Sequence, residues 1–447
     1  MRAAGILVLT SALAPMLAPV LTWAQSPLPL SMKRAVEIAL APDGSTRVAL
    51  ARESIQQAEQ KVLQAKAAFL PNLDASVQDR RQTTNLLAFG FRFDLPVPGF
   101  SLPTIVGPFS VLDARATAQY SVLNLGDIHR YKAAKASLAA VKLDNETTRN
   151  QVSDDTAHAY LACLRADAVR DTARANVELA QALVDLARRA QTAGTGTGIE
   201  VTRAEVQLAN NRQLLIRAGN DRTRTMLQLL KVMGLRLDAP VEFTDKLAYQ
   251  SFDPAPAEAL LSQARKARPE LKTQARREEA ARLSHVAIKS ERLPTIGAFA
   301  DYGAIGSDVS ASRATYVYGA SLKVPVFDGG RREARREESY SQYKQEQIRT
   351  RDVGQQVELQ VRMALEALRS AGAEVDAARE GQTLAENELA QARRRYEAGV
   401  ATSLEVTDAQ TRLQRARDNQ VAALYNYNAA RLDLATATGT LGDYINQ

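Results

Sequence analysis

The chain of 447 residues has few of the residue types that crosslink proteins or hold metals, with one cysteine, three histidines and one tryptophan. A single cysteine excludes a disulfide within the chain, and His129, His158 and His285 share no metal-ligand spacing. The sequence therefore predicts no metal site and no cofactor. It contains no recognisable Ser/His/Asp constellation or pair of pocket carboxylates, so we also expect no catalytic residue and no enzyme.

The charge is close to balanced, with 57 Lys and Arg against 50 Asp and Glu and a net charge of +7. This small surplus is spread along the chain, so no nucleic-acid partner is predicted. Cys163 falls on the face of a predicted helix among small and apolar residues, which is typical of a buried structural cysteine.

Proline and phenylalanine are absent from two long windows. None of the sixteen prolines lies in residues 109–239 or 326–447, and none of the ten phenylalanines lies in 110–242 or 328–447. Because proline in a helix interior costs about 3 kcal/mol, these windows predict long uninterrupted helices. Aromatic residues make up only 5% of the chain, which leaves Ala, Leu and Val as the main apolar residues. The predicted fold class is mainly α with a small β part.

The N-terminus has the pattern of a secretory signal peptide. Residues 1–24 contain Arg2, then an apolar run, then the small-x-small sequence Thr22-Trp23-Ala24. The alternative is an N-terminal anchor, which Pro15 and Pro19 disfavour. No later stretch approaches 18 consecutive apolar residues, so no transmembrane helix is expected in the mature chain.

An internal repeat is the strongest feature of the sequence. Residues 187–208 and 392–413 agree at eleven of 22 positions without a gap, at an offset of 205. Gly234 and Gly439 keep the same offset. A repeat of this size predicts two structurally equivalent halves.

Each half has the same predicted order: a helix that ends near Leu-Pro, two strands, a very long helix and a shorter returning helix. The expected helices span residues 47–70, 128–190 and 199–233 in the first half and 271–292, 331–397 and 404–437 in the second. The expected strands span residues 72–80, 116–123, 296–302 and 316–327. Residues 82–112, rich in Phe and Pro, are expected to form a long loop. The returning helix of the second half has coiled-coil spacing at Val406, Ala409, Leu413, Ala416, Ala423 and Tyr427.

Several motifs in this order resemble the TolC-like outer-membrane efflux family, the outer membrane factors. They include Leu-Pro before the first strand of each half, the run Tyr396-Glu397-Ala398-Gly399 and the strand-to-helix junction at residues 324–331. The resemblance covers essentially the whole mature chain.

The resemblance implies a homotrimer in the outer membrane of a Gram-negative-type bacterium, with a twelve-stranded barrel of four strands per chain and a helical coiled-coil tunnel through the periplasm. Four strands cannot close a barrel in lipid, which independently requires several copies. Phe299, Tyr302, Tyr316, Tyr318, Phe327 and Tyr120 are candidates for aromatic girdles facing the outer-membrane lipid. The expected divisions are a signal peptide (1–24), first-repeat helices (25–70), a β-hairpin with an outer loop (71–126), a helical hairpin (127–234), a linker (235–256), second-repeat helices (257–293), a second β-hairpin (294–329), a second helical hairpin (330–440) and a tail (441–447).

The implied function is a passive exit duct for a tripartite efflux pump or a type I secretion system. Its expected partners are a periplasmic adaptor (membrane fusion) protein and an inner-membrane pump of the RND, ABC or MFS type. The alternative is a periplasmic coiled-coil adaptor or scaffold without a pore. Two hairpins and only four predicted strands favour the duct, because adaptors usually present one hairpin flanked by compact β domains.

The tips of the two helical hairpins carry the candidate functional residues. By the resemblance, Tyr396, Asp408, Glu405 and Glu200 are the periplasmic gate candidates. The family's gate arginine falls on Ala401 here, and Arg393, Arg394 and Arg395 are the neighbouring candidates to replace it. The tip residues expected to contact the adaptor are Gly194, Gly196, Gly198, Gly399 and Val400.

A structural role competes for two of the gate candidates. Thr197-x-x-Glu200 and Thr402-x-x-Glu405 both have the capping-box pattern that starts a helix. Asp408 lies outside this pattern and is therefore the better gate candidate. For Tyr396, gate contact and simple packing at the tip are equally favoured. The Gly-x-Gly-x-Gly run at residues 194–198 lacks the context of a phosphate-binding loop.

Overall fold

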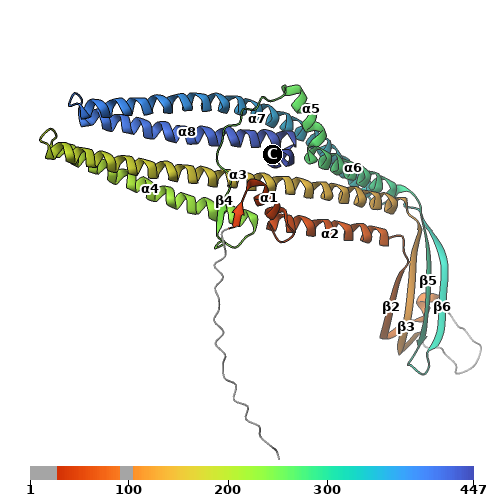
Figure 1. Ribbon diagram of the computed structural model, residues 1–447. Helices are drawn as coiled ribbons and strands as arrows, with labels where there is room; N and C mark the ends of the chain where they lie inside the picture. The colour runs from red at the N-terminus through yellow and green to blue at the C-terminus, as the bar shows by residue number, and fades with distance from the viewer. Residues whose placement is uncertain (1–27, 91–103, 447) are drawn as a thin grey trace, which may run out of the picture.

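The computed structural model describes residues 28–90 and 104–446 and shows an elongated molecule with a helical part and a sheet at one end (Figure 1). The predicted signal peptide and residues 91–103 of the predicted outer loop lie outside the described residues. The helical part is dominated by two hairpins that lie side by side, α3–α4 and α7–α8 (Figure 1).

The two hairpins confirm the repeat. The long helices α3 (Leu125–Thr192) and α7 (Arg331–Glu397) have 68 and 67 residues, and the returning helices α4 (Gly198–Met233) and α8 (Ser403–Thr438) have 36 each. At 1.5 Å per residue, each long helix spans on the order of 100 Å. The absence of proline allows these lengths. Both returning helices end at a glycine in the left-handed region, Gly234 and Gly439, as the 205 offset predicts.

Shorter helices complete each half. The first half has α1 (Met32–Leu40) and α2 (Thr46–Ala67), and the second has α5 (Ala257–Ala267) and α6 (Pro269–Lys289), which continues as the 3₁₀ turn η2 (Ser290–Arg292). A five-residue helix, α9 (Leu441–Ile445), follows α8. Helices α2, α3, α6 and α7 lead toward the sheet (Figure 1).

The sheet has four antiparallel strands in the order β2-β3-β5-β6. They are β2 (Asn72–Asn85), β3 (Ile105–Leu123), β5 (Thr295–Gly306) and β6 (Arg313–Lys323). The prediction of a loop over residues 82–112 is wrong at both ends: β2 extends to Asn85, where the 3₁₀ turn η1 (Leu86–Phe89) follows, and β3 begins at Ile105. Gly107 and Pro108 do not break β3, because the ladder shifts register there, between Gln82 and Thr84 of the partner strand.

The last strand ends earlier than predicted. β6 stops at Lys323 instead of continuing to residue 327. Pro325 explains this end, because proline has no N–H to donate to a strand ladder.

The segment between the halves is more ordered than the sequence suggests. It contains β4 (Val241–Phe243), which pairs in parallel with β1 (Leu28–Leu30) near the N-terminus of the described chain. The hydroxyl of Tyr160 in α3 donates to the carbonyl of Leu30 at 2.8 Å, and its distance to the carboxylate of Asp245 is 2.9 Å. The buried tyrosine thereby attaches this small sheet to the long helix.

The core follows the helices and does not form a globular centre. One buried cluster lies at mid-length, where Tyr160, Leu229 and Leu230 pack with the small sheet. A second cluster joins α5, α7 and α8, and a third lies near the hairpin tips. The predicted coiled-coil residues of α8 are buried except Ala416, which is half-buried.

Candidate functional site

The hairpin tips have the same backbone geometry in both repeats. Gly194 and Gly399 follow the ends of α3 and α7 with φ of 74° and 72°, which is the left-handed region that glycine adopts without strain. After each glycine the chain turns back into α4 or α8. Ile199, Val400 and Leu404 expose 60%, 67% and 54% of their surface, so the tips present apolar side chains to the surroundings.

Glu200 has the capping role that its sequence pattern predicts. Its carboxylate accepts a hydrogen bond from the backbone N–H of Thr197 at 2.9 Å, and the two residues form a capping box at the start of α4. This bond is the main cause that holds the pKa of Glu200 below its ordinary value, and the hydroxyl and backbone of Ser403 in α8 add to it. The Glu200 carboxylate therefore lies near Ser403 at the tip of the second hairpin.

Glu405 has a different role from the one predicted. The capping box expected with Thr402 is not formed in the structure, and the Glu405 carboxylate instead lies 3.1 Å from Nε of Arg395. This ion pair joins the last turn of α7 to the first turn of α8. The prediction failed because a basic residue of the partner helix competes for the carboxylate, which the local pattern does not reveal.

Tyr396 packs at the tip and keeps its hydroxyl free within the described residues. Its ring contacts the tip cluster that includes Leu389, Val406 and Leu413. The Tyr396 Oη atom is buried and has no hydrogen-bond partner there. Burial is the main cause that raises the pKa of Tyr396, and the nearby charge of Glu200 adds to it. The structure thus brings Tyr396 close to Glu200.

Asp408 does not join this group. It is exposed on α8, and its carboxylate makes no hydrogen bond or ion pair within the described part of the chain. In the structure, Glu200 and Tyr396 therefore lie near each other, Glu405 forms an ion pair with Arg395, and Asp408 lies on the surface.

The ion pair between Arg188 and Glu205 near the tip of the first hairpin has no counterpart in the second. In the first hairpin Arg188 lies 2.6 Å from Glu205. The offset of 205 places Arg393 and Gln410 at the equivalent positions, and the Arg393 Nε and Gln410 Nε2 atoms are buried without a partner in the structure as described. The change from Glu to Gln is visible in the aligned repeats, so comparing the two copies position by position would have found it.

The sheet has one apolar and one polar face. The register places small apolar and tyrosine side chains on one face: Leu73, Ala75, Ala116, Ala118, Tyr120, Ala298, Ala300, Tyr302, Tyr316, Tyr318, Ala320 and Leu322. The other face carries Arg115, whose guanidinium lies 2.7 Å from Asp113 and 3.2 Å from Asp301. Such alternation is typical of a strand between lipid and a polar interior. Two girdle candidates are corrected, because Phe299 lies on the polar face and Phe327 lies beyond the end of β6.

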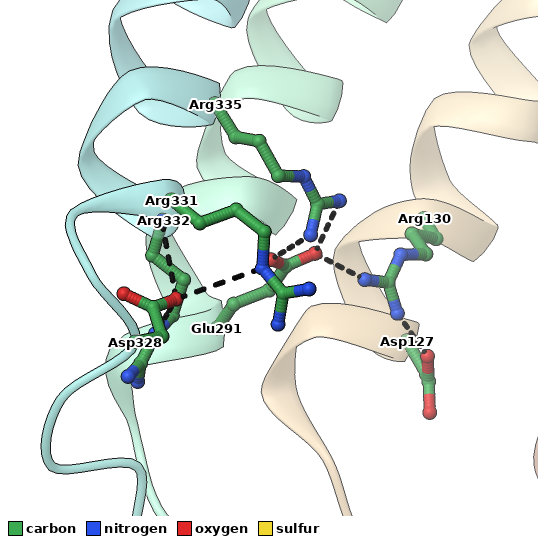
Figure 2. Close-up of polar contacts among 7 residues, drawn as sticks. All are labelled: Asp127, Arg130, Glu291, Asp328, Arg331, Arg332 and Arg335. Atoms are coloured by element: carbon green, nitrogen blue, oxygen red, sulfur yellow. Dashed lines mark hydrogen bonds and ion pairs between the residues drawn. The ribbon is translucent and has the colours of Figure 1, made fainter.

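A group of ionic residues joins the sheet to the helices, and the sequence reasoning missed it (Figure 2). Glu291 accepts from Arg130 of α3 at 2.6 Å and from both terminal nitrogens of Arg335 of α7 at 2.8 and 3.1 Å. Asp328 accepts from the backbone N–H and Nε of Arg332 at 3.2 and 2.8 Å. Sequence spacing gives no signal for Glu291, because Arg130 is 161 residues away.

Two of the three histidines have structural partners, whereas the Nδ1 atom of His129 is buried without one among the described residues. His158 lies 3.0 Å from Asp433, and His285 lies 2.8 Å from the Ser339 hydroxyl. Burial raises the pKa of the Cys163 thiol to about 11, so it is protonated at neutral pH. Over residues 28–90 and 104–446, no three His, Cys, Asp or Glu side chains are grouped to hold a metal ion. Among the described helices, none combines the length and apolar character needed to cross a membrane.

A family model described as "Outer membrane efflux protein" matches residues 38–235 and 260–440, which include both repeats. The chain belongs to this family. It is therefore an outer-membrane efflux protein with a periplasmic tunnel. The expected class of function, an exit duct, is thereby confirmed.

Known relatives agree with this assignment. The chain is 25% identical over 414 residues to the pyoverdine export outer membrane protein OpmQ of Pseudomonas putida, covering 90% of this chain and 84% of that protein. Its fold is similar to the Campylobacter jejuni CmeC outer membrane channel, with a TM-score of 0.77 and 16% identity over 92% of this chain and 86% of CmeC. The Vibrio cholerae outer membrane protein VceC has a TM-score of 0.75 and 18% identity over 91% of this chain and 96% of VceC.

Proposed function

We propose that three copies of this chain close one passive duct through the outer membrane and the periplasm. The supporting observation is the open four-stranded sheet. Its outer strands, β2 and β6, each have a free edge in the single chain as far as residues 28–90 and 104–446 show. Such edges are not tolerated in lipid, so strands of neighbouring copies must pair. Three copies supply twelve strands.

The two faces of the sheet support the same arrangement. The apolar face with Tyr302, Tyr316 and Tyr318 suits lipid, and the face with Arg115 and Asp301 suits a water-filled interior. The long helices continue this interior as a tunnel on the order of 100 Å in length, at about 1.5 Å per residue.

The hairpin tips would bind a periplasmic adaptor, and the adaptor would connect the duct to an inner-membrane pump of the RND, ABC or MFS type. Exposed Ile199, Val400 and Leu404 offer apolar contacts, and Gly194, Gly196, Gly198 and Gly399 keep the tips narrow. Energy would come from the pump, and the duct itself would catalyse no reaction. The OpmQ relatives are pyoverdine export proteins, so export of pyoverdine is the first transport to assay.

The gate would lie at the same tips, with Tyr396, Asp408, Glu405 and Glu200 as its candidate residues. Glu200 and Glu405 already have partners within the chain, whereas the Tyr396 hydroxyl and the Asp408 carboxylate do not among the described residues. Asp408 is exposed and is able to bond across to a neighbouring copy directly, whereas the buried Tyr396 hydroxyl would do so only after a rearrangement of the tip.

Planar-bilayer recording tests the duct. The purified full chain should run as a trimer and should give stepwise ion conductance when added to a bilayer. A chain that is found soluble in the periplasm and gives no conductance would support the scaffold without a pore instead. Counting subunits by mass measurement in detergent tests the trimer separately.

A further inference from the structure

A groove with an excess of positive charge lies where the sheet meets the tunnel helices. Its volume is about 480 Å³, and α3, η2, β5, β6 and the start of α7 contribute its walls. The titratable residues that line it are Arg130, Glu291, Lys323, Asp328, Arg331, Arg332 and Arg335. Five of them are cationic and two are acidic.

The two carboxylates are already used by three of the arginines. Glu291 is shared by Arg130 and Arg335, and Asp328 holds Arg332 (Figure 2). Glu291 and Asp328 are largely shielded, since their side chains expose 15% and 17% of their surface. Both acids are therefore occupied within the wall of the groove.

Two cations remain without a strong acidic partner. Arg331 exposes 79% of its side chain, and its only ionic contact within the described residues is to Asp328, 4.0 Å from its Nε. Lys323 is exposed and has no ion pair in the part of the chain that the structure describes. The groove thus presents a guanidinium and an ammonium group that are available to a ligand.

The register shows to which side the groove opens. Lys323 is paired with Thr295, and both line the groove. Counting along β5 and β6, these residues lie on the same face as Asp301, which is the polar face of the sheet. In the proposed barrel this face is turned to the interior, so the groove opens toward the path of the exported solute.

We propose that this groove binds phosphate or carboxylate groups of solutes that pass from the tunnel into the barrel. Guanidinium groups bind such oxyanions through paired hydrogen bonds, and a nearby ammonium adds a point charge. In a trimer, three grooves would surround the entrance to the barrel as a ring of positive charge, which favours anions. This inference rests on the proposed trimeric duct for its orientation, but binding to the groove itself needs only the folded chain.

Binding of inorganic pyrophosphate tests the groove directly. The full chain, purified in uncharged detergent, is titrated with pyrophosphate by calorimetry at low salt. Lys323→Gln and Arg331→Gln should each weaken binding about two- to fivefold, the effect of removing one partly exposed ionic contact worth up to about 1 kcal/mol. Asp328→Asn, which removes an acidic neighbour of Arg331, should tighten binding.

Lys246→Gln is the matched control, because Lys246 lies in the mid-length segment away from the groove and loses the same charge. It should bind pyrophosphate as the unchanged chain does. The inference is wrong if Lys323→Gln and Arg331→Gln bind as tightly as this control, or if the unchanged chain does not bind pyrophosphate at all.

Channel recording in a bilayer of phosphatidylcholine adds the functional readout. Pyrophosphate should lower the conductance of the unchanged channel, and Lys323→Gln should need about two to five times more of it for the same reduction. A channel that conducts but ignores pyrophosphate overturns the inference and leaves the duct standing. No conductance contradicts the duct, while the calorimetric result still decides the groove.

A lipid headgroup is the competing occupant, because Val326 and Phe327 beside the groove are exposed. In the calorimetric experiment, phosphatidylglycerol in mixed micelles provides this comparison. The solute site is overturned if two results are found together: pyrophosphate does not displace bound phosphatidylglycerol, and Lys323→Gln weakens phosphatidylglycerol binding. The groove would then be assigned to lipid.

Discussion

The carboxylate of Glu291 and the guanidinium of Arg130 are 2.6 Å apart, although one belongs to the second repeat and the other to the first. Arg335 of α7 binds the same carboxylate, so a single acid connects α3, η2 and α7 at the level where the sheet begins (Figure 2). Glu291 therefore holds the two repeats in register at the junction.

Glu291→Gln should destabilise the chain by about 1–3 kcal/mol, because it leaves Arg130 and Arg335 without their shared acceptor. The expected result is a lower midpoint of thermal unfolding in detergent. Glu279→Gln is the control on the same stretch of helix, since among the described residues Glu279 pairs only with Arg276 one turn away on the surface. It should change the free energy of unfolding by less than about 0.5 kcal/mol. Equal effects of the two variants would contradict the role given to Glu291.

The sequence was sufficient to predict the helical part of this fold. The second long helix was expected at residues 331–397 and is found at Arg331–Glu397, because the proline-free window and the flanking glycines mark its ends. The first two strands were underestimated, since the Phe and Pro residues of 82–112 suggested a loop, whereas the ladder accommodates Gly107 and Pro108 by a register shift. Local sequence patterns therefore predicted the helices, whose ends are marked by nearby proline and glycine residues.

The contacts of the site residues show what local sequence patterns do not predict. Glu200 forms its capping box because its partner Thr197 is three residues away, whereas Glu405 forms an ion pair with Arg395 of another helix. Glu291 depends on a residue of the other repeat, and nothing in its own neighbourhood in the sequence identifies that partner. Contacts between elements far apart in the chain follow from packing, which spacing alone does not encode.

His158 should make the stability of the chain depend on pH. The hydrogen bond to Asp433 is the main cause that raises the pKa of the imidazole above its ordinary 6.5, with burial opposing and the charge of Asp154 supporting the shift. A raised pKa in the folded chain means that the protonated imidazole is stabilising. Its contribution is complete below pH 6.5 and is lost as the pH rises through the raised value.

The measurement compares unfolding midpoints of the unchanged chain and His158→Gln at pH 6 and pH 9. The unchanged chain should be the more stable at pH 6, and the difference should shrink at pH 9. Asp433→Asn removes the main partner and should reduce the same pH dependence. If the unfolding midpoints of the two chains differ more at pH 9 than at pH 6, the protonated imidazole of His158 is not stabilising and this prediction is wrong.

The turn at Gly399 should resist substitution although it has free space. A Cβ added there meets no atom within 4 Å, so the cost of Gly399→Ala comes from its φ of 72° alone and should be about 1–2 kcal/mol. Gly399→Asn should cost less, because asparagine tolerates the left-handed region. Gly354→Ala is the matched control: Gly354 lies in the middle of α7, also with open space, and alanine there should stabilise by about 0.5–1 kcal/mol. Thermal unfolding of the three variants gives the comparison, and equal signs at positions 399 and 354 would contradict it.

Tyr396→Phe combined with Asp408→Ala should raise the conductance of the resting channel. Within one chain neither group has a polar partner among the described residues, so the double variant should leave the unfolding midpoint nearly unchanged. In the proposed trimer, each bond lost between neighbouring copies destabilises the closed channel by about 1 kcal/mol. Each loss should therefore lower the ratio of closed to open channels about fivefold.

Single-channel recording measures that ratio. The control variant combines Tyr425→Phe in α8 with Asp171→Ala in α3, which removes one phenolic hydroxyl and one carboxylate away from the tips. The open fraction of this control should equal that of the unchanged channel. If the tip variant and this control conduct alike, the constriction lies elsewhere. Glu405, held by Arg395, would then be the next residue to change, because breaking that pair loosens α7 from α8 at the tip.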